Sequence, residues 1–137
     1  MTKTNTLTFA IMDAPFEASR TATVFRLFDA VLDMGFNINV FAYEGAVYLP
    51  FALQEAHANA VHGRDVLEED HPLPREWVAA LINKARRKSL VLDWVNCGLC
   101  VDERGANEAI PSVRRGSPAD FWTMVVSSDN TLVVGTN

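Results

Sequence analysis

The chain has 137 residues, of which 49% are hydrophobic and 21% charged, which is the size and composition of one globular domain. Its formal net charge of −5 argues against nucleic acid as the main partner, because nucleic-acid binding usually shows as a basic surface. No apolar run reaches the length of a membrane span, and the first residues resemble a strand rather than a signal peptide. We therefore expect a cytoplasmic protein, in a compartment where thiols stay reduced.

The first third of the chain predicts a strand, a helix and a second strand. Residues 7–11 alternate apolar with small or polar side chains, which is typical of a strand. Apolar residues recur at helical spacing over residues 19–34, and Gly35 suits the end of that helix. A second apolar run at residues 36–43 completes a strand–helix–strand unit, which implies a parallel pair with a right-handed crossover.

The remaining elements are predicted to alternate in the same way. In chain order they are a helix at residues 46–60, a polar loop at 63–74, a helix at 74–88, a strand at 90–95, a connecting segment at 106–116, a helix at 117–128 and a strand at 131–135. Trp77, Trp94 and Trp122 each lie in an apolar pattern, so core packing is expected for all three. The pattern predicts a single α/β domain over residues 1–137, a three-layer α/β/α sandwich with a mostly parallel sheet of about five strands.

Both cysteines of the chain, Cys97 and Cys100, follow the strand expected at residues 90–95. Their spacing puts them on one face of a helix that begins where the strand ends. A helix N-terminus favours a negative sulfur, so Cys97 is predicted to be the reactive thiol and to face outward at the rim of the sheet. Backbone N–H groups from Gly98 and Leu99 to Cys100 are expected to stabilise the anion, and Gly98 to leave room for a second sulfur or an incoming thiol.

Ligands of parallel sheets bind beyond the carboxyl ends of the strands. Three segments are predicted to meet at that edge, namely the loop at residues 13–17, the turn at 43–45 and the cysteine turn. The candidate residues of this cleft are Asp13, Tyr43, Glu44 and Gly45. No Ser-His-Asp order or phosphate-binding glycine loop accompanies them, so the pattern does not indicate a hydrolase.

Two stretches resemble the DsrE/TusD-like (DsrEFH-like) sulfur-transfer family. They are residues 41–48 (FAYEGAVY) and the segment from Cys97 to the pair Arg104-Gly105, in an order that spans nearly the whole chain. The resemblance implies that Cys97 carries sulfane sulfur as a persulfide and passes it between partner proteins, as a sulfurtransferase or persulfide carrier. It also implies a trimer, a hexamer or an assembly with related subunits, without a cofactor beyond the transferable sulfur. Cys100 can resolve the persulfide, and Arg104 is a candidate electrostatic helper.

Three alternatives to a sulfur relay remain open at the level of the sequence. The pair Cys97/Cys100 also suits a thiol–disulfide oxidoreductase, which works by thiolate exchange. A metal site would need two further ligands from the histidines, which show no ligand-like spacing, so no metal is expected; they are His57, His62 and His71. In the third alternative, the chain is a non-catalytic subunit of a sulfur-transfer complex.

Overall fold

The computed structural model describes residues 4–56 and 73–135. Within these residues, one sheet contains five strands, and every neighbouring pair is parallel. The strands are β1 Thr6–Ile11, β2 Asn37–Ala42, β3 Leu92–Cys97, β4 Arg114–Gly116 and β5 Asn130–Val134, in the spatial order β4-β3-β2-β1-β5. The predicted α/β class and the predicted number and direction of strands are confirmed.

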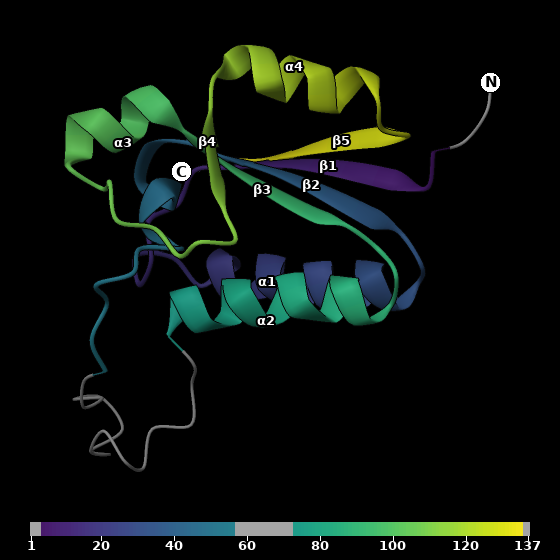
Figure 1. Ribbon diagram of the computed structural model, residues 1–137, viewed down its shortest axis with the longest axis horizontal. Coiled ribbons are helices and arrows are strands. Elements are labelled where there is room, and N and C mark those ends of the chain that lie inside the picture. The colour runs from purple at the N-terminus through teal and green to yellow at the C-terminus, as the bar shows by residue number, and fades with distance from the viewer. Residues whose placement is uncertain (1–3, 57–72, 136–137) are drawn as a thin grey trace.

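Helices cover both faces of the sheet (Figure 1). They are α1 Arg20–Asp33, the 3₁₀ helix η1 Glu44–Tyr48, α2 Pro74–Arg87, α3 Gly98–Arg104 and α4 Pro118–Val126. Figure 1 shows α1 and α2 side by side on one face and α4 on the other, which gives the expected α/β/α layers. In the described part of the chain, no helix has both the length and the apolar character needed to cross a membrane.

The larger core lies between the sheet and the pair α1 and α2. Phe9 of β1, Phe28 of α1 and Trp94 of β3 are almost completely buried in it. The rings of Phe9 and Phe28 meet edge to face with centroids 4.9 Å apart, a favourable arrangement for aromatic pairs. Because side chains alternate along a strand, the opposite face of the sheet carries a second, smaller cluster under α4. The buried members of this α4-side cluster are Phe41, Val95, Cys97 and Met124.

The prediction of a helix at residues 46–60 is wrong for the described residues 46–56. Only the short η1 forms there, and Phe51 then makes an isolated antiparallel bridge with Ala109. Pro50 explains the difference, because proline lacks the N–H that a continuing helix needs and its ring clashes with the preceding turn. Residues 57–60 of that prediction and residues 63–72 of the predicted loop lie outside the described residues.

The strand β4 falls inside residues 106–116, which the sequence presents as a connecting segment. It has three residues, two of them exposed arginines, so it shows no apolar alternation. Its position is decided by pairing with β3, in which Arg114, Arg115 and Gly116 lie beside Val95, Asn96 and Cys97 respectively. The consequence for the site is that two arginines stand next to the cysteine end of β3.

The three tryptophans differ in how far they are buried. Trp94 is 1% exposed, and Trp77 is partly buried against the larger core. Trp122, on α4, is 66% exposed, so its expected core packing is wrong. The reason is that α4 turns mainly Met124 toward the sheet and leaves the opposite side of the helix in solvent.

Candidate functional site

Cys97 is the last residue of β3 and the residue immediately before α3. Its side chain shares a face of the strand with Val95, and both belong to the α4-side cluster. Cys97 is therefore only 6% exposed, and the expectation that it faces outward is wrong. The apolar side chains of Phe41 and Met124 cover this face of the sheet and restrict which molecules reach the sulfur.

Cys100 lies one helical turn further along, in α3, and is partly exposed. Both cysteines are free thiols and belong to the same packed cluster. Burial raises the pKa of the Cys100 thiol, and a hydrogen bond with the Cys97 side chain acts in the same direction. A backbone hydrogen bond from Glu44 acts in the opposite direction. Cys100 is thus a protonated thiol near neutral pH, able to donate a hydrogen bond to the sulfur of Cys97.

Gly98 does not leave the free space beside Cys97 that the sequence suggests. A Cβ built on Gly98 would lie 2.9 Å from Nε of Arg115 and 3.4 Å from its Cγ. The arginine side chain occupies the space next to the glycine, so the prediction that a second sulfur fits there is wrong. Leu99, the next residue, is 70% exposed and presents its side chain to solvent.

Arg104 ends α3 and is engaged mainly with backbone and neighbouring side chains. Its guanidinium donates to the carbonyl oxygen of Cys100 at 3.5 Å and lies 3.4 Å from the carboxylate of Glu103. Its own carbonyl oxygen accepts a hydrogen bond from the hydroxyl of Tyr48. These contacts fix the end of α3 against η1, and the positive charge of Arg104 acts to lower the pKa of the Cys100 thiol.

Three of the four predicted cleft residues, Asp13, Glu44 and Gly45, line one cavity at the carboxyl edge of the sheet, while Tyr43 and the two cysteines do not line it. A cavity of about 370 Å³ is lined by Met12, Asp13, Ala14, Glu17, Glu44, Gly45, Tyr48 and Arg104. Gly45 permits the close approach of the loop after β1 and the turn after β2, since a Cβ on Gly45 would lie 2.7 Å from the Cβ of Ala14. Glu44 links this cavity to the thiols through its backbone hydrogen bond to Cys100.

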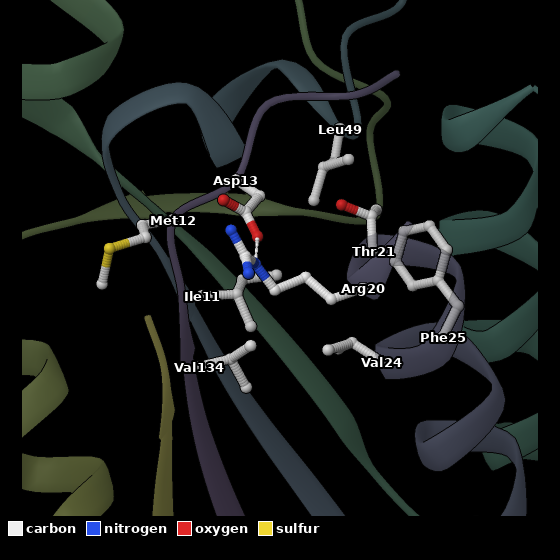
Figure 2. A pocket seen from close by; sticks show the side chains of 9 residues that line it. All are labelled: Ile11, Met12, Asp13, Arg20, Thr21, Val24, Phe25, Leu49 and Val134. Atoms are coloured by element: carbon white, nitrogen blue, oxygen red, sulfur yellow. Dashed lines mark hydrogen bonds and ion pairs between the residues drawn. The ribbon is translucent and has the colours of Figure 1, made fainter. Parts of the chain in front are cut away.

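Asp13 and Tyr43 lie at the same edge but have structural partners. Asp13 forms an ion pair with Arg20, and Figure 2 shows both side chains pointing into a small pocket beside α1 that no cysteine lines. The hydroxyl of Tyr43 lies 3.8 Å from the sulfur of Met12, and burial raises the pKa of this tyrosine. Tyr43 also packs against the cluster that contains Cys97.

Arg115 and its partner Asp102 are the site residues that sequence reasoning misses. The Arg115 guanidinium forms an ion pair with the Asp102 carboxylate and bridges β4 to α3. No local signal points to this arrangement, because it depends on the pairing of β4 with β3.

No group of three or more histidine, cysteine, aspartate or glutamate side chains suited to a metal ion occurs in residues 4–56 and 73–135. The three histidines that the sequence offers as ligands, at positions 57, 62 and 71, lie outside those ranges.

Comparison with known proteins shows the fold and does not establish the family. No protein-family model and no curated protein sequence matches the chain. Among solved structures, the ychN protein from E. coli superposes with a TM-score of 0.72 at 16% sequence identity, covering 98% of this chain and all of that one. At this identity the superposition shows that the two chains share one α/β fold.

Proposed function

We propose that this protein relays sulfane sulfur, which it carries as a persulfide on Cys97. The observation that supports this proposal most is the pair of free thiols, Cys97 and Cys100, which lie in one packed cluster at the carboxyl end of β3. The similarity of the fold to that of YchN is consistent with such a role. A reduced pair of thiols also requires a reducing compartment such as the cytoplasm.

The transfer needs no external oxidant. The Cys97 thiolate attacks the outer sulfur of a donor persulfide, a new S–S bond forms on Cys97, and the donor S–S bond breaks. The donor thiolate leaves with the electron pair, and the sulfur on Cys97 then passes to an acceptor thiolate in the same way.

Cys100 is assigned a supporting role because it keeps its proton. As a hydrogen-bond donor, it stabilises negative charge on the Cys97 sulfur. It can also attack the inner sulfur of a Cys97 persulfide, which forms a Cys97–Cys100 disulfide and releases hydrogen sulfide. The relay then runs only while the acceptor reacts faster than Cys100.

The burial of Cys97 limits the donors and acceptors that the site accepts. The side chains over the sulfur come from β2 and α4, whereas Leu99 and Cys100 present the more accessible part of the site on α3. We therefore propose that donor and acceptor are proteins or small thiols that approach along α3.

Intact-mass spectrometry after incubation with a persulfide donor tests the relay. Wild-type protein is expected to gain the mass of one sulfur on the peptide that contains Cys97. Cys97→Ser should abolish this gain, while Cys100→Ser should retain at least part of it because it leaves the attacking sulfur in place. Equal loading of wild type and Cys97→Ser would remove the proposal.

A thiol–disulfide oxidoreductase is the second candidate, and the position of the two free thiols in one packed cluster favours it. In that function the pair reduces a substrate disulfide and itself becomes a Cys97–Cys100 disulfide. Insulin reduction separates the two candidates: turnover that requires both cysteines, without persulfide loading, would favour the oxidoreductase. Absence of both reactions would favour a non-catalytic subunit, with which the burial of Cys97 is compatible.

A further inference from the structure

Arg115 is placed against both chain neighbours of Cys97. In the parallel register of β3 and β4, Arg115 lies beside Asn96, and Gly116 lies beside Cys97. The Arg115 side chain then extends over Gly98, where a Cβ would come within 2.9 Å of Nε. A positive charge therefore stands at the start of α3, next to the cysteine but outside the apolar cluster that buries it.

Arg115 forms an ion pair with Asp102 that is weak enough to be exchanged for another anion. The side chains of Arg115 and Asp102 are 51% and 57% exposed. Ion pairs this exposed contribute little net stability and are screened by salt, so another anion can take the place of the carboxylate.

Arg115 also borders a cavity that can hold a small ligand. The cavity has a volume of about 220 Å³ and lies between α3, β4 and the segment that joins them. Its apolar wall includes Val101, Ala106 and Ile110, and its polar wall consists of Asn96, Asn107, Arg114 and Arg115. It therefore combines a contact surface for a carbon skeleton with a guanidinium for a negative group.

We propose that Arg115 is a specificity-determining residue that selects anionic sulfur donors for reaction at Cys97. The inference rests on the proposed function. Small-molecule persulfides and thiosulfate are anions near neutral pH, and a planar guanidinium binds such groups with two parallel donors. The donor anion displaces Asp102 from Arg115, and the guanidinium holds it beside Gly98, the residue that follows the cysteine.

Two disulfide reagents of different charge test this role on a single thiol. In the Cys100→Ser background, only Cys97 reacts, and release of the aryl thiol gives the rate by absorbance. Arg115→Gln is expected to slow the dianion dithiobis(nitrobenzoate) about fivefold, the effect of one close charge pair in water. The rate with neutral dithiodipyridine should stay within about twofold, since no charge pair is lost with that reagent.

Arg114 provides a matched control. It is the preceding residue of β4, lines the same cavity, and its side chain is also 51% exposed. Its guanidinium is paired with the carboxylates of Asp93 and Asp120, whereas the atoms nearest to Gly98 all belong to Arg115. Arg114→Gln should leave the ratio of the two rates unchanged. Gly98→Ala keeps the charge but displaces the Arg115 side chain, and it should lower the ratio as Arg115→Gln does. Arg115→Lys keeps a positive charge, so its ratio of the dianionic to the neutral rate should lie between those of wild type and Arg115→Gln.

The proposal is overturned if Arg115→Gln slows both reagents equally, which is the result of a purely structural role. It is also overturned if Arg114→Gln matches Arg115→Gln, which is a general effect of surface charge, or if Cys97 of the folded chain reacts with neither reagent. These reagents report on the thiol alone, so the result is independent of persulfide loading. Loading without charge selectivity would remove this inference and leave the sulfur relay in place.

Discussion

Cys100 holds its proton because burial and the neighbouring Cys97 side chain both oppose formation of its thiolate. The midpoint of its alkylation by iodoacetamide is therefore expected above the ordinary cysteine pKa of about 8.5. Cys97→Ala removes the hydrogen bond and the charge of its neighbour and should lower that midpoint. Peptide mass spectrometry of samples quenched across a pH series measures both values, and an unchanged midpoint in Cys97→Ala would contradict the coupling.

The same shift has a consequence for folding stability. A thiol whose pKa is raised in the folded state favours the protonated protein. Its contribution to stability is present below the pKa of the unfolded chain and is lost as the pH rises through the folded-state pKa. We expect wild type to lose more stability than Cys100→Ser between pH 7 and pH 10, as measured by urea unfolding at each pH.

The start of α4 shows how one element is fixed by its first turn. The backbone N–H of Ser117 donates to the Asp120 carboxylate at 2.7 Å, and Pro118 occupies the first helical position. This hydrogen bond and the nearby charge of Arg114 lower the pKa of Asp120. The sequence Ser117 to Asp120 predicts this helix start, and the structure confirms it.

Asp120→Asn tests that arrangement, because asparagine resembles the protonated carboxyl group. At pH 7 the variant should unfold roughly 3 °C below wild type. A carboxyl group with a lowered folded-state pKa adds stability above its unfolded pKa, about 3.9, and loses it as the pH falls through the folded-state value. Circular dichroism melts should therefore converge by pH 2. A constant difference at both pH values would show that the charge of Asp120 plays no part.

At the scale of the whole molecule, the face around α4 is the less completely covered one. Figure 1 shows α4 over this face, with α3 beside the carboxyl ends of the strands, whereas α1 and α2 cover the other face. Trp122 and Val126, one turn apart on α4, are 66% and 62% exposed, and Val133 of the edge strand β5 is 63% exposed. Exposed apolar side chains of this kind are typical of a surface that associates with another protein.

The homo-oligomer expected from the sequence remains a prediction, and this surface offers a test. Trp122→Ser should reduce the mass measured by light scattering on a size-exclusion column, because it removes a large apolar contact. Leu99→Ser is the control, since Leu99 is 70% exposed, close to the 66% of Trp122, but lies on α3. A monomeric wild-type protein would contradict the homo-oligomer and leave an assembly with related subunits as the remaining expectation.

Much of the fold follows from local patterns. Apolar alternation and helical spacing predict β1, α1, β2, α2, β3, α4 and β5, because each signal lies within a few consecutive residues. The two failures have physical reasons: Pro50 stops a helix that the apolar residues around it suggest, and β4 is too short and polar to show a pattern. The candidate site was predictable only in part, since the sequence placed Asp13, Glu44 and Gly45 at one edge but missed Arg115.

The sequence by itself determined that two thiols stand at the end of a strand and the start of a helix, since their spacing and flanking residues are local. Only the tertiary structure decided that Cys97 is covered by β2 and α4, that Cys100 is the more accessible thiol, and that Arg115 fills the space at Gly98. The physical reason is that exposure and charge at a residue depend on what packs against it. For Cys97 those neighbours come from segments far away in the chain, brought there by strand pairing and helix docking.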